Sequence, residues 1–177
     1  MPPKIRRRSG AFPIPLAALF RFALPFGIAA SLASTGCDQA EAQSAFDLAA
    51  RADPSGITAT TSAGEVTRRD PDDWRVSPLF ATRIAVSPVF PNPASSASLV
   101  RVGVTSFEFE GAPNGLVLYR RSRDGVLTRL DSRTTQGPGA YELSAPTALL
   151  GGAGLYRLIV TDAFGQTVTY GDLEVGQ

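Results

Sequence analysis

Residues 74–177 predict an all-β fold, a sandwich or a barrel. Short apolar runs alternate with turn-forming residues at close, regular spacing, which is typical of antiparallel sheets. Within several of these runs the apolar side chains recur at every second position, the period of a strand that buries one face. The composition changes at Trp74, and we expect Trp74, Leu79 and Phe80 to fasten the preceding segment onto the domain.

The expected strands are identified by this alternation and by the turns between them. One run places Val100, Val102 and Val104 on the same face of a strand. Between two later runs, the step Asp124-Gly125 provides the positive-φ residue that a hairpin turn needs. The strands are expected at residues 84–86, 99–104, 107–110, 116–121, 126–131, 141–143, 155–162, 166–170 and 173–175.

Residues 107–110 alternate between aromatic rings and carboxylates. A strand would turn Phe107 and Phe109 inward and leave Glu108 and Glu110 on the solvent face. Two carboxylates on one face could also form a paired-acid catalytic site. The alternation alone explains their spacing, so we expect a solvent face and no catalysis here.

Residues 1–37 have the layout of a bacterial signal peptide. A basic start, Lys4 to Arg8, precedes an apolar run, and no acidic residue stands in this part of the chain. The run from Phe22 to Ala33 has the length of a signal-peptide core and is shorter than the roughly 20 residues of a spanning helix. A mature transmembrane anchor is the alternative, which Arg21 and Pro25 disfavour.

Residues 34–37, Ser-Thr-Gly-Cys, resemble the lipobox of bacterial lipoproteins, with Gly36 before the cleaved bond. The resemblance implies cleavage before Cys37 and lipidation of its thiol. Cys37 is the single cysteine of the chain, so an intramolecular disulfide is impossible. A buried or redox-active thiol is the alternative interpretation.

Residues 38–73 are expected to form a flexible tether between the lipid and the domain. They contain only four large apolar residues, too few to offset the entropy of ordering the backbone. A helix over residues 40–52, with Ser44 as its N-cap, would be too short to be stable alone. The domain organisation is therefore signal peptide 1–37, tether 38–73 and β-sandwich 74–177.

Two stretches resemble ligand-binding motifs but lack residues that those motifs require. The run Asp70-Pro71-Asp72-Asp73 lacks the alternating oxygen ligands and the glycine of a calcium loop, so we expect a solvated acidic joint. The glycine-rich turn at residues 149–154 lacks the Lys-Ser/Thr pair of a phosphate-binding loop. We expect no metal and no cofactor.

Five arginines cluster around the hairpin expected at Asp124-Gly125. They could form a basic rim for anionic lipid heads or for a polysaccharide. Outward arginines that protect an exposed sheet edge are the alternative, and it is the one we favour. The cluster consists of Arg120, Arg121, Arg123, Arg129 and Arg133.

Several short motifs resemble the C-terminal type-A sorting domain of proteins exported by the bacterial type IX secretion system. The resemblance covers about residues 88–175. It implies a single immunoglobulin-like antiparallel β-sandwich of about seven strands, and it implies an export function. The motifs are Phe90-Pro91-Asn92-Pro93-Ala94, Leu118-Tyr119 through Asp124-Gly125, Gly154-Leu155-Tyr156, Asp162 to Gly165 and Leu173 to Val175.

The sequence therefore predicts a lipid-anchored cell-envelope protein, on the periplasmic face or the outer-membrane surface. Its partners would be the membrane, through Cys37, and an envelope protein or a polysaccharide. The alternative is a secreted type IX cargo whose C-terminal domain is a sorting signal. Residues 38–177 carry 12 arginines and all 16 acidic residues, a formal charge of −4, which argues against a nucleic-acid partner. The chain has no histidine for a Ser–His or Cys–His pair, so we expect no enzyme.

Overall fold

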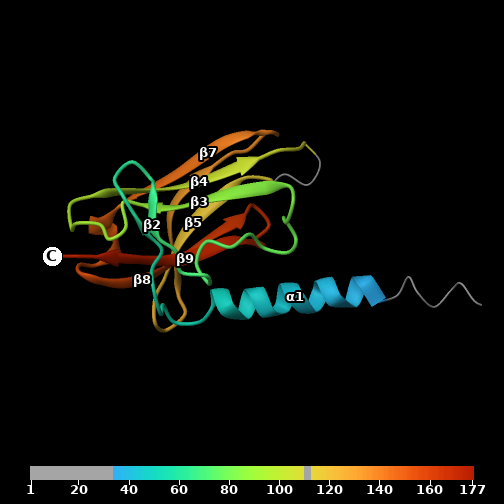
Figure 1. Ribbon diagram of the computed structural model, residues 1–177, viewed down its shortest axis with the longest axis horizontal. Helices are drawn as coiled ribbons and strands as arrows, with labels where there is room; N and C mark the ends of the chain where they lie inside the picture. Colours follow the sequence, from blue (N-terminus) through green and yellow to red (C-terminus); the bar gives the residue numbers. More distant parts are fainter. Residues whose placement is uncertain (1–33, 110–112) are drawn as a thin grey trace, which may run out of the picture. The chain divides into compact units, whose positions relative to one another are not determined.

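The all-β sandwich predicted from the sequence is confirmed by the computed structural model, which describes residues 34–109 and 113–177 (Figure 1). The basic and apolar parts of the expected signal peptide lie outside the described residues. Seven strands form two antiparallel sheets, one of three strands and one of four. The first sheet contains β3 (Ile84–Phe90), β4 (Leu99–Ser106) and β7 (Gly139–Pro146), and the second contains β6 (Leu127–Arg133), β5 (Leu116–Arg121), β8 (Gly154–Asp162) and β9 (Thr167–Val175) in that order.

The chain forms hairpins within each sheet and crosses to the other sheet between them. It passes from β4 to β5, returns at β7 and then completes the larger sheet with β8 and β9. This division with crossing connections is the immunoglobulin-like arrangement. The turn expected at Asp124-Gly125 is confirmed, because Gly125 has a φ of 84° and its N–H donates to the Ser122 carbonyl at 3.0 Å.

The core lies between the two sheets and is built from the inward positions of the strands. Val100, Val102 and Val104 share the buried face of β4 as predicted, and none is more than 1% exposed. Leu158 and Val160 face them from the larger sheet and belong to the same apolar cluster. The alternation that predicted the strands therefore also predicted which side chains form the core.

The expected strand over residues 107–110 is wrong, because β4 ends at Ser106. Phe107 and Phe109 are 55% and 79% exposed, so their rings do not face inward. Ser106 is the last residue of β4 in register with both neighbouring strands. The Phe107 N–H still donates to the Arg83 carbonyl at 2.9 Å, and the strand pairing ends there. Glu110 lies outside the described residues.

The flexible tether expected over residues 38–73 is also wrong, because this segment is folded against the sandwich. It contains α1 (Ser34–Ala50), β1 (Ala59–Thr60) and β2 (Val66–Arg68), and α1 lies alongside β9 (Figure 1). Ser44 lies inside α1 and is not its N-cap. We call α1 together with residues 51–73 the N-terminal cover.

Apolar contacts hold α1 on the outer face of β8 and β9. Phe46 and Ala50 are buried against Ile159 and Tyr170, and the rings of Phe46 and Tyr170 are 5.0 Å apart. A helix that is marginal alone is thus stabilised by tertiary packing of one face. As a result, both faces of β8 from Arg157 onward and of most of β9 are buried, one by the core and the other by the N-terminal cover.

The end of the N-terminal cover is fastened by Trp74, as the sequence predicted. Trp74 is 4% exposed and belongs to the core cluster with Phe80, while Leu79 packs against that cluster. The indole lies over Gly171, where an added Cβ would come within 2.3 Å of the ring. Gly171 belongs to β9, which runs unbroken where the sequence suggested two strands.

Candidate binding site

The structure divides the five clustered arginines into two groups. Arg129 and Arg133 lie on β6, an edge strand of the larger sheet. Arg133 pairs with Asp131 at 3.0 Å, and Arg129 donates to the Ser132 hydroxyl. Charged, locally paired side chains on an edge strand discourage pairing with another chain. The other three arginines line a pocket.

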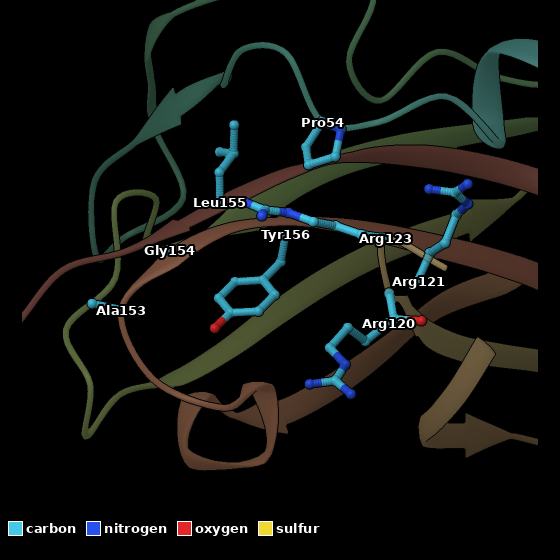
Figure 2. Close-up of a pocket in the computed structure, with 9 residues that line it drawn as sticks. Pro54, Arg120, Arg121, Arg123, Ala153, Gly154, Leu155 and Tyr156 are labelled. Carbon is cyan, nitrogen blue, oxygen red and sulfur yellow. The ribbon is translucent and has the colours of Figure 1, made fainter. Parts of the chain in front are cut away.

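This pocket has a volume of about 280 Å³ and lies between the β5–β6 turn and the start of β8 (Figure 2). Strand order creates it, because β5 and β8 are neighbours and their register pairs Arg121 with Arg157. The end of β5 therefore lies beside the beginning of β8. Besides Arg120, Arg121 and Arg123, the lining includes Pro54, Leu155 and Tyr156.

Arg120 is fixed by the backbone of the segment that precedes β8. Its Nη1 donates to the Leu150 carbonyl at 2.5 Å. That carbonyl ends the 3-10 helix η1 (Thr147–Leu150), and Gly151 then turns the chain with a φ of 101°. The Nε of Arg120 is buried without a hydrogen-bond partner among the described residues. This Nε is buried, so it is not presented to the open side of the pocket.

Arg121 and Arg123 differ in their partners. Arg121 pairs with Asp53 of the N-terminal cover at 3.2 Å, and its guanidinium points away from the other two in Figure 2. Arg123 extends from the turn toward Leu155 in the same view. In the part of the chain that the structure describes, no carboxylate lies within 4.0 Å of the Arg123 guanidinium.

Tyr156 supplies the pocket with an aromatic ring held in place at both ends. The ring packs against the core, and its hydroxyl donates to the Gly152 carbonyl at 2.9 Å. A phenol that donates one hydrogen bond keeps its oxygen lone pairs as acceptors. In Figure 2, Tyr156 and Arg120 point in the opposite direction from Leu155, so the polar and apolar side chains of the pocket lie on different sides of β8.

One acidic side chain stands in the turn itself. Asp124 accepts a hydrogen bond from the Ser122 hydroxyl, and this bond holds the pKa of the Asp124 carboxyl below its ordinary value. Asp124 is therefore ionised at neutral pH, and Asp53, the partner of Arg121, is the second carboxylate beside the pocket. Three guanidinium groups and these two carboxylates leave the surroundings of the pocket with a net positive charge.

A second polar cluster lies beneath the N-terminal cover and is sealed from solvent. Arg157 and Asp172 form an ion pair whose side chains are 5% and 1% exposed. Arg157 also donates to the Ala49 carbonyl at 2.8 Å, and the Asp172 carboxylate accepts the Ser55 N–H at 2.9 Å. The ion pair thus joins both the C-terminal end of α1 and the segment that follows it to the larger sheet.

Asp73 and Asn92 complete this cluster. Asp73 accepts the N–H groups of Thr58 and Asp172 at 2.8 and 3.0 Å, and its burial raises the pKa of its carboxyl to about 7. The Asn92 amide donates to the carbonyls of Thr58 and Asp172, each at 2.9 Å. The solvated joint expected at residues 70–73 is therefore wrong for Asp73, which is 4% exposed.

The sequence indicated some of these residues and missed others. The arginines were visible because they flank Asp124-Gly125, and Asn92 was visible only through the resemblance. Pro54 and Arg157 gave no local signal, because their roles depend on contacts with distant segments. Glu108 is exposed beyond the end of β4, and its expected companion Glu110 is outside the described residues.

The expected lipidation site stands in α1. Cys37 falls in the first turns of this helix, which continues to the contacts of Phe46 and Ala50 with the sheet. None of the helices in residues 34–109 and 113–177 combines the length and the apolar character needed to cross a membrane. Over the same residues, no group of three or more acidic, histidine or cysteine side chains is arranged to hold a metal ion.

Comparison with known proteins adds no family assignment. No protein-family model matches the chain, and no curated protein matches it.

Proposed function

We propose that this chain is a lipid-anchored cell-envelope protein whose β-sandwich serves as a binding module. The observation that carries the proposal is the order of residues 4–37: a basic start, an apolar run, small residues and then Cys37. A thiol at that position is suited to receive a lipid. The anchored protein would lie on the periplasmic face or the outer-membrane surface.

The N-terminal cover supports a specific geometry for this anchor. From Cys37 to Ala50 the helix rises about 20 Å, at 1.5 Å per residue. Its last two turns are packed on β8 and β9 through Phe46 and Ala50. The lipid would thus be joined to the sandwich by a short helical arm, and the sandwich would stand at a fixed distance from the bilayer.

A binding role is supported by the arginine pocket, and we propose no catalytic role and no cofactor. The pocket is lined by guanidinium groups and by apolar side chains. Most small-molecule sites have this composition, with a few polar groups that fix the orientation of the ligand. The partners would be the membrane, through the lipid, and an envelope component carrying an acidic group.

Cys37→Ala tests the anchor. The variant should lose acyl labelling and accumulate as an uncut precursor, because the thiol accepts the lipid before cleavage. Metabolic labelling with an alkyne fatty acid and membrane fractionation measure both effects. Ser44→Ala is the matched control, since Ser44 is an exposed residue of the same helix. A Cys37→Ala protein that labels and fractionates like the wild type would exclude the lipoprotein.

A secreted type IX cargo is the second candidate, favoured by the motif Phe90-Pro91-Asn92-Pro93-Ala94. Asn92 is fully buried and bonds to β9 and to Thr58. A transferable signal should therefore include the N-terminal cover. Fused behind a secreted reporter, residues 38–177 should export it from a host with the type IX machinery if this candidate is correct. Retention of the reporter in the periplasm supports the lipoprotein.

A further inference from the structure

We propose that the end of the sandwich that carries Phe107, Phe109 and Phe164 contacts a phospholipid bilayer, with these rings in the head-group region. We call it the aromatic end. The presence of a membrane rests on the proposed function. The inference adds which surface of the sandwich faces that membrane.

Three aromatic side chains are exposed among the residues that the structure describes, and all three belong to the aromatic end. Phe107, Phe109 and Phe164 are 55%, 79% and 75% exposed. Every other described tryptophan, tyrosine and phenylalanine is buried or half-buried. Phenylalanine is among the residues that peripheral proteins bury at the boundary between head groups and acyl chains. The gathering of these rings at one end therefore points to a membrane contact.

Hydrogen bonding shows that the rings come from neighbouring loops. Phe107 and Phe109 follow the last residue of β4, and Phe164 lies in the turn between β8 and β9. The Ala163 N–H of this turn donates to the Asn114 carbonyl at 3.1 Å. Asn114 and Phe109 line the same small pocket. The two loops are therefore adjacent, although they follow strands of different sheets.

The loops present two of the rings on ordered backbone. The Phe109 ring lies over Gly137, where an added Cβ would come within 2.5 Å of the ring. In the β8–β9 turn, the Asp162 carboxylate accepts the N–H groups of Phe164 and Gln166 at 2.9 and 2.8 Å. Backbone groups that are already bonded cost less to bring beside lipid. Ordered groups also lose little conformational entropy on binding.

The packing of α1 shows in which direction its N-terminal end lies. Near the C-terminal end of α1, the Ala49 carbonyl accepts a hydrogen bond from Arg157, close to the start of β8. Farther toward the N-terminus, Gln43 accepts the Ser77 hydroxyl at 2.8 Å, and the Ser77 N–H donates to the Val168 carbonyl at 3.0 Å. Since Val168 is close to the start of β9, α1 runs toward the β8–β9 turn.

The anchor and the aromatic end therefore lie at the same end of the molecule. Six residues lead from Gln43 to Cys37, a rise of about 9 Å. Two residues lead from Val168 back to the turn, about 7 Å along the strand. Figure 1 shows the blue, N-terminal end of α1 and the arrowhead of β4 directed to the same side. A lipid on Cys37, or a membrane span formed by residues 11–33, would bring the bilayer to the aromatic end.

The charges beside the rings limit how deeply they enter. Glu108 stands between Phe107 and Phe109 in the sequence, and the Phe107 N–H donates to the Arg83 carbonyl at 2.9 Å. The side chains of Arg83 and Glu108 are exposed. Charged groups are costly in hydrocarbon, whereas head groups and water solvate them. The rings should therefore reach the head-group region and no deeper.

Fluorescence quenching tests the contact on the full chain as cells produce it, in vesicles of phosphatidylethanolamine and phosphatidylglycerol. The emission of Phe109→Trp and of Phe164→Trp should shift to the blue and be strongly quenched by brominated lipids, because an indole is at home in the head-group region. Leu149→Trp is the matched control, since Leu149 is 55% exposed and follows β7 at the opposite end. The native Trp74, 4% exposed, gives the background. All three variants replace exposed residues, and melting curves check their folding.

Acyl labelling and flotation of the same samples separate the two proposals. Equal quenching of the three variants, or no quenching while the acylated chain floats with the vesicles, overturns the membrane contact and leaves the anchor intact. Self-association that Phe164→Ser abolishes, without quenching, also overturns it and assigns the rings to a contact between copies. Quenching at the aromatic end in a chain without acyl label retains the contact and rejects the lipid. A chain that neither carries acyl label nor floats rejects both.

Discussion

The outer face of the larger sheet has a covered half, β8 and β9, and an uncovered half, β5 and β6. Arg157 and Arg121 are register partners on neighbouring strands of this face. Arg157 lies beneath the N-terminal cover with a side chain 5% exposed, and its partner Asp172 is buried with it. Arg121 stands at the edge of the cover with a side chain 14% exposed, and it pairs with Asp53, which is 73% exposed.

The difference shows that the cover decides what an arginine on this sheet does. A buried ion pair is costly to break, about 3–5 kcal/mol, because removal of one partner leaves the other charge unpaired. An exposed pair contributes about 0–1 kcal/mol and exchanges readily for another partner. Arginines under the cover therefore hold the fold together, whereas the partly exposed pair of Arg121 at its edge contributes less to stability.

The largest expected effect is the loss of Asp172. Asp172→Ala should lower the free energy of unfolding by about 3–5 kcal/mol, because Arg157 would remain buried without its carboxylate. Urea unfolding followed by circular dichroism measures the change. Glu142→Ala is the control, since it breaks the exposed pair with Arg101 at 3.2 Å and should cost less than about 1 kcal/mol. Equal effects of the two variants would contradict the distinction between buried and exposed ion pairs.

The sandwich could be predicted because its signals are local. The alternation in β4 and the turn at Gly125 each involve only a few consecutive residues, and the structure has both as predicted. The run at residues 107–110 alternates equally well, yet it forms no strand because β7 offers no partner beyond Gly139. Alternation shows that a segment could pair, and sheet topology decides whether it does.

The N-terminal cover could not be predicted from its own composition. Its few apolar side chains suggested that it could not offset the entropy of folding. The stabilisation that offsets this entropy comes from hydrogen-bond acceptors far along the chain. An example is the Asp172 carboxylate, which accepts the N–H of Ser55, 117 residues away. The arginine pocket has the same character, because the order of the strands brings Tyr156 to it and the folding of the N-terminal cover brings Pro54.

A smaller effect is expected from the apolar contact of α1. Phe46→Ala should destabilise the docked helix by about 3 kcal/mol, because a buried ring against Tyr170 is removed. Hydrogen exchange of residues 38–50 should accelerate while β4 stays protected. Leu48→Ala is the control on the same helix, since Leu48 is 73% exposed and should have almost no effect. Unchanged exchange in Phe46→Ala would show that polar contacts alone hold the cover.

The smallest effect concerns pH. Burial raises the pKa of Asp73 from 3.8 to about 7, so between these values the folded protein binds a proton that the unfolded chain does not. The contribution of Asp73 to stability is therefore complete below pH 3.8 and is lost as the pH rises through 7. Relative to Asp73→Asn, the wild type should lose about 2–3 kcal/mol between pH 5 and pH 8. Asp72→Asn, whose side chain is 81% exposed in the wild type, is the control and should follow the wild-type pH dependence. A difference between wild type and Asp73→Asn that stays constant with pH would show that the covered carboxyl titrates like an exposed one.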